Sequence, residues 1–186
     1  QSILEFCVIE KSKQEICSFV GYKNLTYFTR KYLWEQHNLT TGSGNSYRRF
    51  AIIRLAELYL NYAEALNEAE GPTAEVYNAV NKIRRRAQLL DLPANLTKDE
   101  MRNKIRQERR VELAFENHRF WDVRRWKIAE IVDNKKVHKI TVNADGTYSY
   151  PVFQNRVFDK AKHYLFPIPQ SEIDKNRNLV QNPGWN

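Results

Sequence analysis

The chain has few of the residues that interrupt or cross-link a polypeptide. Its 186 residues include 6 glycines, 6 prolines and 2 cysteines, whereas 42% of them are hydrophobic. So little glycine and proline argues against collagen-like and low-complexity chains. No apolar run approaches the roughly 20 residues that a membrane-spanning helix needs. The composition therefore predicts a folded domain of ordinary size with a core of its own.

The two cysteines, Cys7 and Cys17, lack the spacing of a metal site. They do not form a Cys-x-x-Cys pair, and no histidine follows them at zinc-finger spacing. A disulfide that closes this short loop and a pair of buried free thiols both remain open. No motif for a metal or a cofactor is found elsewhere, so we expect the protein to work without either.

An excess of positive charge does not by itself predict nucleic-acid binding. The net charge is +8, but residues 50–133, which are rich in arginine, carry 15 basic and 14 acidic groups. A surface that contacts nucleic acid needs unpaired lysine and arginine on one face. Here each arginine run has carboxylates three or four residues away, so we expect ion pairs instead.

Helical spacing of apolar residues begins near Phe50. One stripe and a second apolar face predict a helix that is covered on two sides and that ends at Gly71 and Pro72. Thr73 is placed to cap a following helix with a buried stripe of its own, which gives an antiparallel helical pair resembling one tetratricopeptide unit. A single pair cannot bury a continuous core, so either other elements cover it or its neighbours are missing. The residues of these faces are Ile53, Ala56, Leu60 and Ala63; Leu55, Leu58, Tyr59, Tyr62 and Leu66; and Val76, Val80, Ile83 and Ala87.

Two further helices and a corner between them are predicted downstream. Thr97 and Glu100 form a capping box at the start of a helix over residues 98–116. Asn117 follows, and asparagine tolerates the left-handed conformation that ends helices. A second helix is expected from Arg119 to about Val132.

Strands are predicted in two places. Alternating aromatic residues favour a strand over residues 22–34, and residues 38–46 read as a loop. Residues 137–142 and 147–153 flank Asn143 to Gly146, the signal of a four-residue hairpin loop. Two prolines, Pro167 and Pro169, fix an extended backbone in the tail. The predicted fold is mainly α, with tetratricopeptide-like helical pairs, a small β-hairpin and long loops.

Three glutamates, Glu108, Glu112 and Glu116, recur every four residues on one side of the predicted helix. Such carboxylates can serve as acid and base, or as ligands of a di-iron site, but the Glu-x-x-His motif of the latter is missing. We favour an ion-pair network that braces the corner at Asn117, because partly buried charges are usually paired. The expected cations are Arg109, Arg110, Arg119, Arg124 and Arg125, which would pair with these glutamates and with Asp122.

Aromatic side chains are the candidates for ligand contact. Tyr27, Tyr32, Trp34 and Tyr47 lie on the predicted strand or beside the loop, where a flat ring with a polar tip suits stacking on a sugar or on another protein. Core packing is the alternative for these four residues. Phe120, Trp121 and Trp126 stand at helical spacing and are expected in the core.

Four segments, read in order, resemble the SusD/RagB family: Arg54 to Leu66, Glu108 to Trp126, Phe166 to Ile173, and Gln181 to Trp185. The family usually has glycine at the position of Asn117 and often proline at that of Arg177. The resemblance implies a mainly helical fold of the α-α superhelix type. It also implies that the chain is a C-terminal portion. Residues 1–49 would be an extended segment, and residues 50–186 the C-terminal domain, helical over 50–133 with the hairpin and tail over 134–186.

What the resemblance implies about function is binding without catalysis. Members are surface lipoproteins of the outer membrane of Bacteroidetes that hold glycans or other nutrients over a SusC-like TonB-dependent transporter. We therefore expect an oligosaccharide and this transporter as partners, no nucleic acid, and a membrane link only through a lipid anchor absent from this sequence. The alternative is a helical adaptor that contacts the transporter without binding sugar. An enzyme is not expected, because no catalytic constellation is found.

Overall fold

The computed structural model describes Lys31 and residues 51–143, 145 and 147–185. Lys31 and residues 51–119 belong to one compact unit, and residues 120–185 to a second. Apart from Lys31, the strand predicted over residues 22–34 lies outside the described residues, and so do both cysteines. The disulfide and the division into residues 1–49 and 50–186 therefore stay predictions.

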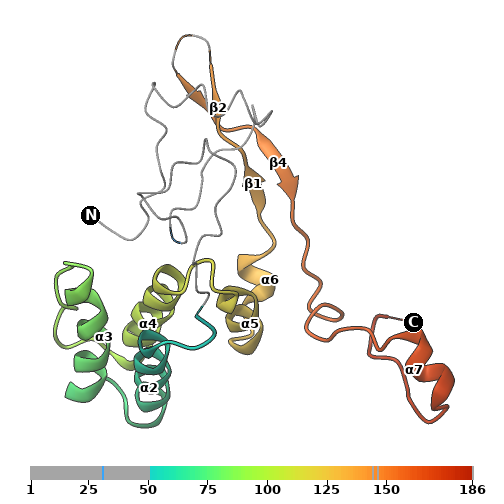
Figure 1. Ribbon diagram of the computed structural model, residues 1–186, viewed down its shortest axis with the longest axis horizontal. Helices are drawn as coiled ribbons and strands as arrows, with labels where there is room; N and C mark the ends of the chain where they lie inside the picture. The colour runs from blue at the N-terminus through green and yellow to red at the C-terminus, as the bar shows by residue number, and fades with distance from the viewer. Residues whose placement is uncertain (1–30, 32–50, 144, 146, 186) are drawn as a thin grey trace, which may run out of the picture. The chain divides into compact units, whose positions relative to one another are not determined.

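Three helices build the first unit: α2 (Leu55–Glu70), α3 (Ala74–Arg86) and α4 (Lys98–Glu112). Helix α2 contacts both α3 and α4, and the three lie side by side in Figure 1. Gly71 ends α2 with a φ of 93°, a conformation that glycine adopts without steric cost. Helix α3 begins three residues later, at Ala74, so the predicted helical pair is confirmed.

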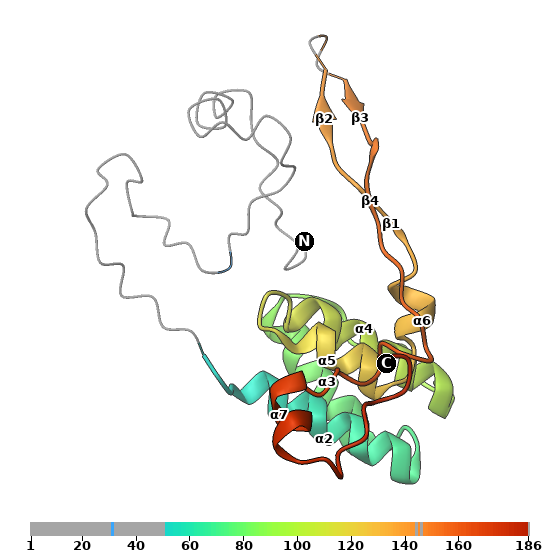
Figure 2. The same cartoon turned by 90° about the vertical axis from the view of Figure 1, so that its right-hand side faces the viewer.

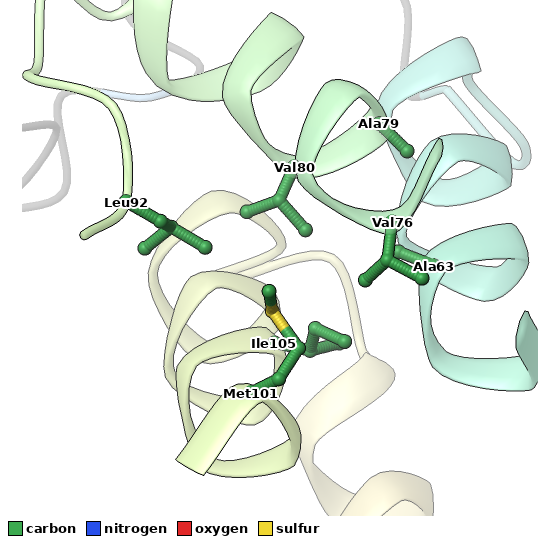
Figure 3. Close-up of a cluster of buried hydrophobic side chains, with 7 residues drawn as sticks. All are labelled: Ala63, Val76, Ala79, Val80, Leu92, Met101 and Ile105. Atoms are coloured by element: carbon green, nitrogen blue, oxygen red, sulfur yellow. The ribbon is translucent and has the colours of Figure 1, made fainter. Parts of the chain in front are cut away.

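The core of this unit forms where the apolar stripes of the three helices meet. Figure 3 shows its members pointing into one cluster: Ala63, Val76, Ala79, Val80, Leu92, Met101 and Ile105. Leu60, Ile83 and Leu113 form a second buried cluster. Burying one large apolar side chain contributes about 1.5–3 kcal/mol, so these clusters are the main source of the unit's stability.

The second apolar face of α2 is not covered as predicted. Leu55, Leu58 and Tyr62 recur at helical spacing, and each is half or more exposed to solvent. Two other members of this face, Tyr59 and Leu66, are partly buried against the core, whereas Leu60 and Ala63 of the first face are fully buried. The sequence pattern identified two apolar faces correctly, but α3 and α4 pack against one of them.

The capping box that starts α4 is confirmed, because Thr97 Oγ1 accepts a hydrogen bond from the backbone N–H of Glu100 and the Glu100 carboxylate accepts one from Thr97 N–H. The end of α4 differs from the prediction. The helix stops at Glu112, four residues early, and the turn that follows places both Phe115 and Asn117 in the left-handed region, at φ of 63° and 65°. The left-handed Asn117 is thus confirmed, whereas Phe115 was not anticipated.

Beyond this turn the predicted single helix is divided. Helix α5 (His118–Arg125) ends before Lys127, whose φ is 54°, and α6 (Ala129–Val132) follows. The left-handed residue interrupts the helical hydrogen bonds, which the apolar periodicity alone did not reveal. In the second unit Val123 of α5 and Ala129 of α6 pack with Phe158 in a small core.

The predicted hairpin is confirmed. Strand β1 (Lys136–His138) pairs antiparallel with β4 (Val152–Asn155), and β2 (Thr141–Val142) pairs with β3 (Tyr148–Ser149). Figure 2 shows the β2–β3 pair lying beyond the β1–β4 pair along the same hairpin. Within the β1–β4 ladder the register shifts between Val137 and His138. The tail ends in α7 (Gln170–Lys175), and the mainly helical fold class is confirmed.

Candidate functional site

Two groups of side chains stand out in the described residues, and the first is a buried row of carboxylates on α4 and the turn after it. Glu108, Glu112 and Glu116 are all buried. Glu112 accepts hydrogen bonds from Arg54 at 2.6 Å and from Arg86 at 2.8 Å, and its side chain is 2% exposed. We call these three glutamates the carboxylate row.

Its remaining members are paired in the same way. The guanidinium of Arg84 donates to Glu108 at 2.8 Å, and the Nε of Arg54 donates to Glu116 at 2.7 Å. Lys31 forms an ion pair with Glu116 and donates to the backbone carbonyls of Glu112 and Ala114, at 2.8 Å each. The cations thus hold the end of α4 as well as its side chains.

The expected ion-pair network is confirmed, but the cations seen on the carboxylate row are not the ones that were expected. Those that bind the carboxylate row come from the last turn of α3, from the residue before α2, and from Lys31. Successive residues of a helix point about 100° apart, so Arg109 faces away from Glu108 and lies instead with Asn61 and Glu64. One expected pair does form, since Arg125 donates to Asp122 at 3.0 Å.

Ion pairing shifts the pKa of two members of this network, Glu116 and Arg54. Burial raises the pKa of Glu116, but hydrogen bonds and charge attraction from Arg54 and Lys31 outweigh it, so its pKa lies below the usual value. Burial likewise lowers the pKa of Arg54, and its bonds to Glu116 and Glu112 reverse that effect and raise it. A general acid or base works best with a pKa near the working pH, so the shift at Glu116 favours a bracing role.

The second group is an aromatic cluster of the second unit, formed by Phe120, Trp121 and Phe166. Their ring centroids lie 5.0 Å (Phe120 to Trp121), 6.0 Å (Phe120 to Phe166) and 6.1 Å (Trp121 to Phe166) apart. The three side chains are 42%, 60% and 55% exposed, in the same order as they are named above. The prediction that Phe120 and Trp121 are core residues was therefore wrong. We call the three rings the aromatic surface.

Arg124 supports the aromatic surface from α5. Its guanidinium carbon lies 3.5 Å from the centre of the Phe120 ring, a cation–π contact, and it donates a hydrogen bond to the Phe120 carbonyl at 3.1 Å. Among the described residues no carboxylate pairs with Arg124, in contrast to the arginines that bind the carboxylate row.

Polar side chains near the end of the chain hold the backbone around Phe166. Gln181 makes two hydrogen bonds with the backbone of Ile168, accepting at 2.8 Å and donating at 2.9 Å. Asn182 donates to the carbonyl of Phe166 at 2.7 Å, and the indole N–H of Trp185 donates to that of Leu165 at 3.0 Å. These three residues of the tail thus hold the backbone of residues 165–168. We call Gln181, Asn182 and Trp185 the clamp.

The four rings predicted to contact a ligand lie outside the described residues, so the structure leaves Tyr27, Tyr32, Trp34 and Tyr47 as predictions. The sequence reading missed Trp121 and Phe166. One signal was available: Phe120 and Trp121 are adjacent, and two neighbours on a helix cannot both point straight into one core.

Two features are absent from the described residues. Within residues 51–143, 145 and 147–185, no three side chains of the metal-binding types gather closely enough to hold an ion. The described helices also include none with the length and apolar character needed to cross a membrane.

Comparison with known proteins gives consistent results. The model of the SusD family matches residues 7–185. SusD-like protein P2 of Formosa agariphila is 36% identical over 141 residues, which are 72% of this chain and 25% of that protein. The chain thus spans about a quarter of the length of the curated relative.

Solved structures agree with these matches. A SusD-like protein from Bacteroides fragilis is 37% identical, with a TM-score of 0.68 over 74% of this chain and 26% of that one. Surface glycan-binding protein A from Bacteroides thetaiotaomicron, solved in complex with laminarihexaose, is 28% identical with a TM-score of 0.51, over 73% of this chain and 25% of that one. Sequence, fold and family model agree, and the chain belongs to the SusD family.

Proposed function

We propose that the full-length protein binds a glycan or another nutrient at the cell surface, without altering it, and delivers it to a SusC-like TonB-dependent transporter. In this proposal it is an outer-membrane lipoprotein. The observation that carries the proposal is the family match over residues 7–185, together with the similarity to a surface glycan-binding protein in complex with laminarihexaose.

A non-catalytic role accords with the chemistry of the described residues. Glycoside hydrolysis generally needs two carboxyl groups flanking the bond that is broken, one of them with a raised pKa. In the carboxylate row each glutamate instead binds at least one cation at short range, and the side chains are buried. The glutamates of the carboxylate row therefore serve to hold the helices together through ion pairs.

One observation favours the adaptor as a second candidate function. The exposed apolar face of α2, with Leu55, Leu58 and Tyr62, has the spacing of a helix-packing surface. Such a face suits contact with another protein, because amphipathic helices pack through apolar residues at this spacing. An adaptor would contact the transporter through a face of this kind and bind no glycan.

Calorimetric titration of the full-length protein separates the two candidates. The panel is laminarihexaose, maltohexaose, xylohexaose and mannohexaose, and each sample is analysed for cleavage products after long incubation. Saturable binding of at least one glycan without cleavage is the expected result. Cleaved sugar contradicts the non-catalytic role. Failure to bind any of the four, with binding to the transporter retained, favours the adaptor.

A further inference from the structure

We propose that the aromatic surface is a subsite for one sugar ring, with Trp121 as the stacking face and Phe166 beside it. This inference rests on the proposed function, and it adds a location that the sequence reading did not predict. The four rings predicted from sequence belong to residues 27–47, whereas this subsite lies on α5 and the proline-rich tail.

The exposure of the rings points to Trp121. It is the most exposed of the three at 60%, and Phe166 follows at 55%. Their planes are inclined by 56°, with centroids 6.1 Å apart, so they present two faces that are not parallel. A sugar stacked by its C–H face on the indole would meet the phenyl ring at its side. Trp and Tyr are favoured for such contacts because a large apolar face carries a polar edge.

Phe120 has a supporting role, because its ring already contacts three other side chains. Arg124 lies over the ring at 3.5 Å, Phe166 stacks against it at 6.0 Å with an inclination of 29°, and Trp121 meets it edge to face at 86°. It therefore supports the other two rings from behind. Trp121 and Phe166 remain the rings with open surface.

Arg124 adds a positive charge beside these rings. Its guanidinium stacks on Phe120, and no described carboxylate neutralises it. Charged donors form hydrogen bonds about twice as strong as neutral ones, and sugar hydroxyls are acceptors as well as donors. An uncompensated guanidinium next to exposed rings is therefore a combination that suits a carbohydrate.

The subsite is also held in shape before a ligand arrives. Gln181 fixes Ile168 with two hydrogen bonds, and Asn182 binds the carbonyl of Phe166. The prolines on both sides of Ile168 restrict the backbone further. Binding to a preformed surface loses less conformational entropy than binding to a mobile one. The clamp thus positions Phe166, and its residues need not touch the ligand.

A competing occupant is an apolar segment of the same polypeptide that packs onto these rings in the full-length protein. The two occupants differ in what removal of a ring does. Loss of a sugar-stacking ring lowers affinity and leaves stability almost unchanged. Loss of a ring packed inside the protein lowers stability strongly.

The test uses the full-length protein and the tightest-binding glycan of the four-member panel. Trp121→Leu and Phe166→Leu keep an apolar side chain and remove the ring, Trp121→Tyr keeps a ring, and Phe153→Leu on β4 is the matched control. Phe153 is exposed in the same unit and takes no part in the ring contacts of the aromatic surface. Affinity is measured by calorimetry and the melting temperature by differential scanning calorimetry.

We expect Trp121→Leu to weaken binding about two- to tenfold, the range of an aromatic pair contact. Phe166→Leu should weaken it less, Trp121→Tyr should retain most of the affinity, and Phe153→Leu should match the wild type. Unchanged affinity in both leucine variants overturns the subsite and leaves the proposed function standing. A large drop in the melting temperature of Trp121→Leu also overturns it, in favour of the buried segment. If the wild type binds none of the four glycans, the result counts against the sugar subsite and favours the adaptor as the function.

Discussion

The carboxylate row and the aromatic surface differ in burial, and each reverses what is usual for its type of side chain. In the first unit charged groups, which usually face water, are buried and paired. In the second unit large rings, which usually form the core, are about half exposed. A buried charge needs partners to remain stable, whereas an exposed ring has no need of them. The charged cluster thus stabilises the fold, whereas the exposed rings are the part of the contrast on which the proposed sugar subsite depends.

The largest expected effect is the loss of Arg54. This side chain binds both Glu112 and Glu116, so Arg54→Ala leaves two buried carboxylates without their shared partner. Breaking a buried ion pair from one side costs about 3–5 kcal/mol, and we expect the free energy of unfolding to fall by at least this much. Urea denaturation followed by circular dichroism measures it.

The matched control is Lys175→Ala, which removes an exposed pair with Glu172 on α7. Surface pairs contribute about 0–1 kcal/mol, so this variant should unfold almost as the wild type does. Similar losses in the two variants would show that the network around Arg54 is superficial.

The next effect concerns the clamp. Gln181→Ala removes both hydrogen bonds to the backbone of Ile168. Leaving partly buried polar groups unpaired costs about 1–3 kcal/mol, and the near-ultraviolet circular dichroism of the aromatic surface should weaken as Phe166 loses its fixed position. Gln170→Ala, which loses only an exposed contact with Asp174, is the control. An unaltered spectrum in Gln181→Ala contradicts the positioning role.

A smaller effect is expected from pH. The pKa of Glu116 is lower in the folded protein than the usual value of about 4.3 in an unfolded chain. Its stabilising contribution is therefore complete above that unfolded value and is lost as pH falls through the folded pKa. The difference in unfolding free energy between wild type and Glu116→Gln should shrink between pH 6 and pH 3. A difference that stays constant over this range argues against the ion pairs.

Local signals in the sequence predicted local structure well. Thr97 and Glu100 act within one turn of helix, and the capping box is confirmed. The loop around Asn143 joins strands as expected, and Asn117 takes up the left-handed conformation. Each of these features depends on residues within a few positions of one another, so the local sequence is sufficient to predict it.

Contacts between distant segments were predicted less well. That Glu112 needs a cation follows from its position on an apolar helix side, but its partners lie 58 and 26 residues away along the chain. The exposure of Trp121 likewise depends on where α5 packs, and helical periodicity does not state which apolar face receives a neighbour. The same limit explains why the second face of α2 was expected to be buried.

The contrast between the carboxylate row and the aromatic surface can be tested most directly in the full-length protein. The unfolding free energies of Glu112→Ala and Trp121→Leu are measured side by side. Glu112 is 2% exposed and binds two arginines, whereas Trp121 is 60% exposed. This difference in burial predicts a loss of about 3–5 kcal/mol for the first variant and less than about 1 kcal/mol for the second. Equal losses, or a larger loss in Trp121→Leu, would contradict it.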